Sequence, residues 1–196
     1  IKTWLATGTG HMATISGTTL DQQPANGDIM AKFSSRGQNR ALPDIVKPDV
    51  TAPGVGIMAA YSDGVEYNII QGTSMSSPHV AGAGALLMAL HPDWTAAEVQ
   101  SALMSTSVTT VVDNDGATQA DPFAMGAGRV DLAQAGLAGL LFDETTAAFE
   151  AADPADGGDP SSLNLPSMGQ DQCVGTCSWT RTVENAMAVA GNWTAS

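Results

Sequence analysis

Basic residues are scarce in this sequence. Only 7 lysines and arginines accompany 20 acidic residues, which gives a formal net charge of −13. Nucleic acid is therefore a poor partner, because phosphate binding requires clustered Lys and Arg. The acidity is consistent either with solubility alone or with the steering of basic substrates. Long apolar runs are also missing. The longest, around residues 80–90, contains glycines and ends at His91-Pro92, which predicts a buried helix rather than a membrane span.

Cysteine is limited to Cys173 and Cys177. A metal site would need more ligands. The pair forms either a short-loop disulfide in an oxidising compartment or two free thiols. The first residues, Ile1-Lys2-Thr3-Trp4, contain no initiator Met and no charged flank leading into an apolar run, so they are not a secretory signal. We expect the chain to begin within a longer protein.

Hydrophobic residues make up 43% of the 196 positions, enough for a packed core in one domain, or in one domain and part of a second. The first half contains short apolar segments separated by Pro and Gly, which favours strands. Asp63-Gly64 lies between the last two segments and predicts a hairpin. The candidate strands are residues 29–33, 49–51, 55–61 and 65–71.

Residues 74–90 are small or apolar on nearly every face, which predicts a buried helix. Gly82 and Gly84 would each cost about 1 kcal/mol in an exposed helix. Their presence predicts that a neighbouring backbone approaches closely. His91-Pro92 ends the helix, because the residue before proline is displaced from the helical region.

Two shorter helices are expected after this one. The capping-box pattern Thr95-Ala96-Ala97-Glu98 predicts a helix over residues 96–105. Asp131 predicts the start of a third, ending at Ala135. Residues 150–162 are rich in Pro, Gly and Asp and are typical of a linker, and residues 179–183 alternate as a strand does.

Ser74 lies where a predicted strand passes through Gly72 into the long helix. A serine there is close to unpaired backbone N–H groups at the positive end of the helix dipole. Those groups can stabilise an oxyanion that develops on an attacked carbonyl. The alternative is that Ser74 or Thr73 only caps the helix. The residues by themselves leave both interpretations open.

The segment Gly72-Thr73-Ser74-Met75 resembles the nucleophile motif of the subtilases, the subtilisin-like serine proteases of peptidase family S8. Ser76 stands where the commonest form of the motif has Ala. Further segments resemble the family in the same order, and together they cover roughly residues 20–145. They are Phe33-Ser34-Ser35-Arg36-Gly37, residues 47–54, His91-Pro92 with the capping box, and Gly126-Ala127-Gly128-Arg129-Val130-Asp131.

The resemblance implies an α/β fold, namely the C-terminal part of a doubly wound, mostly parallel sheet with a buried central helix. It implies a secreted, extracellular serine endopeptidase that acts through an acyl-enzyme on protein or peptide substrates. No cofactor is needed for this chemistry. Calcium is a common structural ion in the family, but the sequence shows no complete ligand set, and Asp49 is typical of a turn residue.

Residues beyond 139 resemble the junction and first strands of the fibronectin-III-like domain of larger subtilases. The implied organisation has four parts. Residues 1–20 return from a protease-associated insertion, residues 21–145 are the C-terminal part of the catalytic domain, residues 146–162 are a linker, and residues 163–196 begin the fibronectin-III-like domain.

The departures from the family concern the catalytic partners of the serine. None of the motifs that carry the family's Asp, His or oxyanion Asn precedes Ser74. Only Ser74 is therefore transferred, as nucleophile and through its backbone N–H as an oxyanion donor. His79 lies five residues further on, roughly 140° around the helix, and we expect it to be buried and structural. His91 ends the helix, and nothing brings His11 close to Ser74.

We therefore expect the chain to be inactive alone and to associate with the N-terminal half of the catalytic domain. Without that half, the apolar surface of residues 81–90 should be exposed, which favours association or dye binding. The alternatives are a non-catalytic interaction module and a truncated, inactive fragment.

Overall fold

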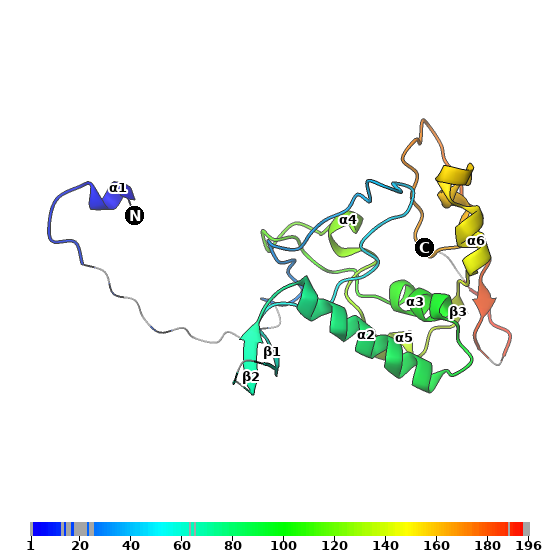
Figure 1. Cartoon of the computed structure of the whole chain (residues 1–196), viewed down its shortest axis with the longest axis horizontal. Coiled ribbons are helices and arrows are strands. Elements are labelled where there is room, and N and C mark those ends of the chain that lie inside the picture. Colours follow the sequence, from blue (N-terminus) through cyan, green and yellow to red (C-terminus); the bar gives the residue numbers. More distant parts are fainter. Residues whose placement is uncertain are drawn as a thin grey trace.

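The computed structural model describes residues 2–12, 14, 17, 23, 26–62, 64, 66–187 and 189–193. Two long helices lie at the centre, and short helices, two-stranded sheets and long irregular segments surround them (Figure 1). The elements are α1 (Lys2–Leu5), β1 (Ile57–Ala60), β2 (Tyr67–Ile70), α2 (Thr73–Leu90), α3 (Ala96–Ser105), α4 (Pro122–Met125), α5 (Leu132–Ala135), β3 (Leu140–Leu141), α6 (Thr146–Ala151), the 3-10 helices η2 (Pro154–Asp156) and η3 (Pro160–Ser162), and β4 (Glu184–Asn185).

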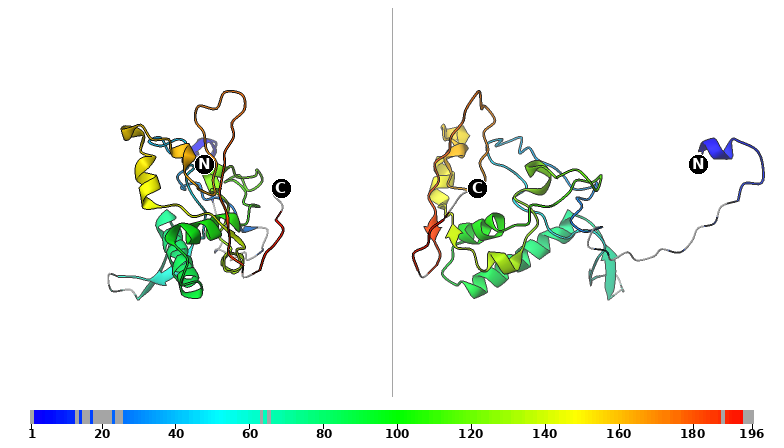
Figure 2. Two further views of the ribbon diagram at one scale, coloured as in Figure 1. Left: turned by 90° about the vertical axis from the view of Figure 1, so that its right-hand side faces the viewer. Right: turned by 180° about the vertical axis from the view of Figure 1, so that it is seen from behind.

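The predicted hairpin is confirmed. β1 and β2 pair antiparallel, with Met58 opposite Ile69, and Figure 2 shows this hairpin projecting from the helices. β3 pairs antiparallel with β4. Among the described residues, parallel pairing occurs only as the isolated bridges Ile29–Val112 and Thr51–Arg129. The expected strands over 29–33 and 49–51 are therefore single bridges, since a ladder needs several consecutive pairings. The described residues alone do not form the expected mostly parallel sheet.

The main core lies where α2, α3, α5 and β3 meet. Leu87 of α2 and Leu141 of β3 are each 1% exposed, and Ala102 and Ala135 are fully buried between them. A second cluster of buried residues anchors the irregular segments that surround the helices. It consists of Met30, Val111, Ala120, Ala124 and Met125.

The capping box at α3 is present as predicted. The Thr95 hydroxyl accepts a hydrogen bond from the Glu98 N–H (3.1 Å), and the Glu98 carboxylate accepts one from the Thr95 N–H (2.6 Å). The Thr95 hydroxyl also donates to Asp143 at 2.7 Å, which ties the start of α3 to the segment after β3. Ser101, fully buried, accepts a hydrogen bond from the Phe142 N–H. These bonds fix α3 against the main core.

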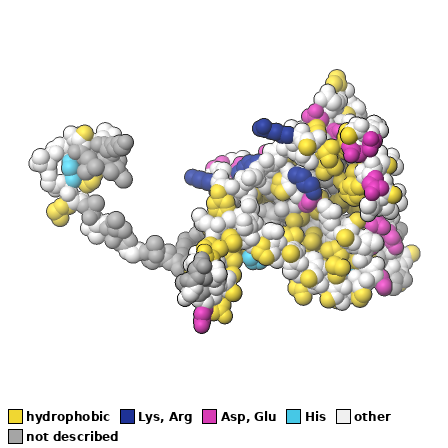
Figure 3. All heavy atoms as spheres, viewed as in Figure 1, with side chains coloured by type: hydrophobic (Ala, Val, Ile, Leu, Met, Phe, Trp, Pro, Cys, Tyr) yellow, Lys and Arg dark blue, Asp and Glu magenta, His cyan; other side chains and the backbone are white. Residues whose placement is uncertain are grey.

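The expectation that α2 is buried on every side is wrong for the described residues. Only Ala83 and Leu87 are buried, whereas Leu86, Met88 and Leu90 are 60%, 55% and 62% exposed. α3 and α5 cover one face of the helix, and the described chain provides nothing comparable for the other. Figure 3 shows hydrophobic side chains exposed on the side of the molecule along which α2 runs in Figure 1. No helix in the described part of the chain is long and apolar enough to cross a membrane.

Residues 146–162, the expected linker, contain short helices. They form α6, η2 and η3, and Ala152 and Pro160 are buried. Further on, the predicted strand over 179–183 is wrong, since β4 begins at Glu184. The Arg181 guanidinium donates to the Leu165 and Ser161 carbonyls, and burial lowers the pKa of Arg181. The C-terminal segment is therefore held largely by side-chain hydrogen bonds to backbone carbonyls.

A disulfide joins Cys173 and Cys177, which answers the question that the sequence left open. The loop that contains it reaches back to the first third of the chain. The Asp171 N–H donates to the Asp44 carboxylate (2.7 Å), and the Gln38 amide donates to the Asp171 carboxylate (3.0 Å). These bonds join segments more than 100 residues apart in sequence.

Candidate active site

Ser74 is the second residue of α2 and is exposed. The N-cap is Gly72, which makes no side-chain capping bond, so the alternative that Ser74 or Thr73 caps the helix is wrong. Within the described part of the chain, neither the Ser74 hydroxyl nor its N–H makes a hydrogen bond. The turn therefore presents an exposed hydroxyl and an unpaired N–H at the positive end of an 18-residue helix.

Backbone hydrogen bonds shape this turn. The Gly72 N–H donates to the Gly54 carbonyl at 2.9 Å, and the Met75 N–H donates to the Gly72 carbonyl at 3.0 Å. Gly72 has φ +156°, a backbone conformation that favours glycine because L side chains rarely adopt it. The passage from β2 into α2 thus depends on a glycine and on a second glycine distant in sequence.

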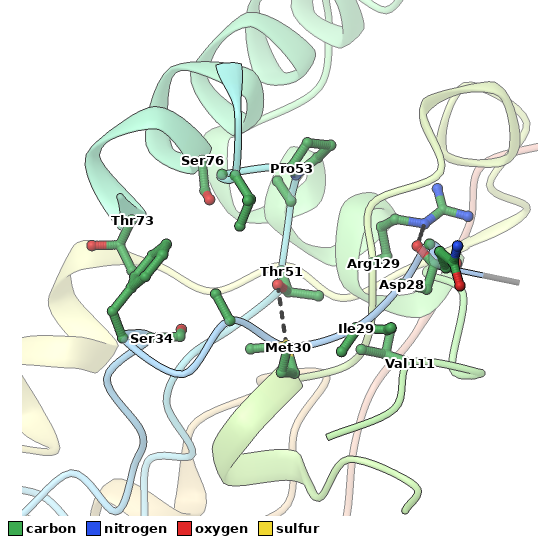
Figure 4. A pocket seen from close by; sticks show the side chains of 17 residues that line it. Asp28, Ile29, Met30, Ser34, Thr51, Pro53, Thr73, Ser76, Val111 and Arg129 are labelled. Atoms are coloured by element: carbon green, nitrogen blue, oxygen red, sulfur yellow. Dashed lines mark hydrogen bonds and ion pairs between the residues drawn. The ribbon is translucent and has the colours of Figure 1, made fainter. Parts of the chain in front are cut away.

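A cavity of about 400 Å³ lies beside the turn (Figure 4). Thr73 and Ser76 line one end of the cavity, and Met30 lies on its wall, where it accepts a hydrogen bond from the Thr51 hydroxyl. Asp28 and Arg129 line the other end as an ion pair, with Nε and Oδ1 2.6 Å apart. Ser74 itself does not line the cavity, whereas Thr73 and Ser76 of the same helical turn do.

The described histidines make their hydrogen bonds and ring contacts with residues other than Ser74. His79 is exposed rather than buried, and its Nδ1 lies 2.7 Å from the Met75 carbonyl of its own helix. The ring of His91 stacks on Trp94, with centroids 3.8 Å apart, and its Nε2 lies 3.0 Å from the Gly136 carbonyl. His11 contacts Trp4. In the part of the chain that the structure describes, no histidine is hydrogen-bonded to Ser74.

Asp113 and Asp49 make their ion pairs within irregular segments of the described chain. Asp113 pairs with Arg36, and its pKa is lowered first by the hydrogen bond from the Asn114 N–H and then by Arg36. Asp49 accepts both of its side-chain hydrogen bonds from Lys47. No three His, Cys, Asp or Glu side chains among the described residues form a group that could hold a metal ion.

Two features of the site were missed at the level of sequence. One is the cavity, which is lined by residues from five separate stretches of the chain, between Asn26 and Arg129. The other is the contact of Gly54 with the first turn of α2. The Ala52-Pro53-Gly54 turn is recognisable in the sequence, but its partner in space is not, because no local pattern connects residues 54 and 72.

Comparison with known proteins identifies the family. Residues 5–128 match the Subtilase family, peptidase S8. Subtilisin-like protease SBT1.7 of Arabidopsis thaliana is 36% identical over 225 residues, which covers 93% of this chain and 30% of that protein. Subtilisin-like protease Glyma18g48580 of Glycine max is 43% identical over 145 residues, which covers 64% of this chain and 18% of that protein. The chain thus spans less than a third of the length of these relatives.

Among solved structures, the keratinolytic enzyme fervidolysin from Fervidobacterium pennivorans is similar over 46% of this chain and 15% of its own, with a TM-score of 0.38 and 26% identity. The family match alone covers more than half of the sequence. The chain therefore belongs to the subtilase family.

Proposed function

We propose that this chain supplies the nucleophile of a subtilisin-like serine endopeptidase, and that the nucleophile is Ser74. One observation carries the proposal. In a member of the subtilase family, an exposed serine hydroxyl lies in the first turn of an 18-residue helix, beside its own unpaired N–H. The substrates are proteins or peptides, and the parent protein is secreted.

The chemistry is acyl transfer. Ser74 Oγ attacks the scissile carbonyl, and the Ser74 N–H and the positive end of α2 stabilise the oxyanion. A histidine accepts the hydroxyl proton and returns it to the leaving amine, an aspartate orients that histidine, and water then hydrolyses the acyl-enzyme. No cofactor takes part in these steps.

The histidine, the aspartate and the oxyanion asparagine come from polypeptide outside these 196 residues. The histidines present support this assignment, because the described ones make their hydrogen bonds or ring contacts with residues other than Ser74. In subtilisin, loss of the catalytic Ser or His alone lowers kcat by about 2 × 10⁶-fold. The isolated chain is accordingly inactive.

The missing part of the catalytic domain covers the exposed face of α2. Leu86, Met88 and Leu90 are more than half exposed there, and a groove of about 340 Å³ runs along the helix between His79 and Leu86. Apolar surface of this kind on a soluble domain marks a site for a partner.

The proposed domain organisation has four parts. Residues 1–20 return from a protease-associated insertion, and residues 21–145 belong to the catalytic domain. Residues 146–162 link the catalytic domain to a fibronectin-III-like domain, which begins with residues 163–196.

A fluorophosphonate probe, which acylates activated serines, tests the proposal. We expect no labelling of the isolated chain and clear labelling of the full-length gene product. Labelling should disappear in Ser74→Ala and persist in Ser77→Ala, which removes another exposed hydroxyl from the same turn.

The outcomes separate the alternatives. If the full-length protein is folded but is never labelled, the chain is a non-catalytic interaction module. If the full-length protein carries no histidine- and aspartate-bearing segment, the chain is a truncated and inactive product. If labelling survives Ser74→Ala, another residue is the nucleophile.

A further inference from the structure

The irregular segment Ala52-Pro53-Gly54 lies against the start of α2 through Gly54. The Gly54 carbonyl accepts a hydrogen bond from the Gly72 N–H at 2.9 Å. A Cβ added to Gly54 would overlap with Ser76 Oγ and would lie 2.9 Å from the Gly72 carbonyl oxygen. The backbone of Gly54 is not in the left-handed region, so it is the close approach of α2 that requires glycine at this position.

The hydrogen bond between Gly54 and Gly72 matters because few other contacts hold the first turn of α2 in place. α2 begins without a side-chain cap, and the Ser74 hydroxyl and N–H make no hydrogen bond within the described part of the chain. The Gly54–Gly72 bond therefore connects the turn to a segment distant in sequence. Figure 4 shows Ser76 and Pro53 at the same end of the cavity, where α2 meets that segment.

We infer that Gly54 is a positioning residue for Ser74, resting on the proposed role of Ser74 as nucleophile. Its carbonyl holds Gly72, and its missing side chain lets Ser76 approach, so that together they set where the Ser74 hydroxyl and N–H lie. Reactive groups must be held within about 0.5 Å of their productive position. A shift of about 1 Å can cost a hundredfold in rate.

The test compares glycine variants of the full-length gene product by their rate of fluorophosphonate labelling. Gly54→Ala should lower the labelling rate per folded molecule by about 10- to 100-fold. It should lower kcat for a peptide substrate more than it changes KM, because Gly54 contacts the nucleophile turn. Ser76→Ala alone should have little effect.

Ser76→Ala added to Gly54→Ala should restore part of the rate. It removes the overlapping Oγ and leaves the Ser76 Cβ at 3.6 Å, an ordinary contact distance. The contact with the Gly72 carbonyl remains, so the recovery is incomplete. A double variant no faster than Gly54→Ala would overturn the assignment of Ser76 as the contacting partner.

Gly158→Ala is the matched control for an overlap elsewhere. A Cβ at Gly158 would overlap with the Ala151 carbonyl and lie 2.7 Å from the Ala152 Cα. This variant should lower the melting temperature, while the labelling rate of its folded molecules stays at the wild-type value. All rates are measured below the melting transitions, with the folded fraction taken from circular dichroism. If Gly54→Ala does not fold, Ser76→Thr adds one methyl group to the side chain facing Gly54 and should slow labelling less severely.

Failure of the inference differs from failure of the proposed function. Absence of labelling in the folded wild type would overturn both. Wild-type labelling with an unchanged rate in Gly54→Ala, or an equal loss of rate in Gly158→Ala, would overturn the positioning role and leave Ser74 as the nucleophile.

Discussion

Among the carboxyl groups of the described residues, Asp115 has the most strongly lowered pKa. The Thr118 hydroxyl, followed by the N–H groups of Thr118 and Ala117, lowers the pKa of Asp115 to about 2. A carboxyl with a depressed pKa stabilises the fold above its unfolded value of about 3.9. That stabilisation should be lost as the pH falls from about 4 to about 2.

Thr118→Val should raise the pKa of Asp115 toward 4, because it removes the largest contribution while keeping the shape of the side chain. Carboxyl NMR titration measures this value directly. Thr110→Val, the same exchange at an exposed position of the same loop, should leave the Asp115 titration unchanged. A wild-type midpoint near 4 would contradict the prediction.

The start of α3 allows a prediction at the scale of an element. Thr95→Ala removes the hydroxyl that accepts from the Glu98 N–H and donates to Asp143. Loss of an N-cap typically costs about 1 kcal/mol of unfolding free energy, with a range of about 0.5–2 kcal/mol. Thr95→Ser keeps the hydroxyl and should retain most of this stability. Urea denaturation of the three proteins measures the difference, and equal midpoints would show that the cap is not stabilising.

Elements with strong local patterns could be predicted from the sequence. The capping box predicted α3, Asp63-Gly64 predicted the β1–β2 hairpin, and Asp131 predicted the start of α5. Ser74 was placed correctly at the start of α2 because a glycine precedes a long helical run. Each of these patterns acts within a few residues of the element that it specifies.

Features that depend on distant neighbours could not be predicted. Residues 29–33 and 49–51 have the composition of strands but find only one bridging partner each. Ala152 and Pro160 are buried although the surrounding composition is typical of a linker. α2 is apolar on all sides, and only its packing shows which face is covered. Burial and strand pairing follow from tertiary contacts that propensity does not encode.

In the whole molecule, the two hollows along α2 adjoin each other. The cavity at the start of the helix and the groove along its side share Ala52 and Pro53 as lining residues. The exposed side of α2 therefore continues from the turn that carries Ser74 toward Leu86. A partner that supplied the catalytic histidine would be well placed to cover the apolar face in the same event.

Gly82 distinguishes the isolated chain from the complete catalytic domain. A Cβ at Gly82 would meet nothing within 4 Å, and Gly82 lines the groove beside Leu86. In the isolated chain, Gly82→Ala should therefore stabilise α2 by about 1 kcal/mol. In the complete domain the same change should be neutral or destabilising, because the proposed partner backbone then approaches the glycine.

Gly84→Ala provides the control, because its surroundings are already present. The added Cβ would lie 3.9 Å from Val99 Cγ1 of α3, an ordinary contact, so the close backbone approach expected at Gly84 is absent among the described residues. This variant should be stabilising by a similar amount in both contexts, as measured by chemical denaturation. If Gly82→Ala stabilised the complete domain as much as the isolated chain, no backbone would cover that part of α2. The partner would then have to contact the helix elsewhere, which would remove the physical reason for glycine at position 82.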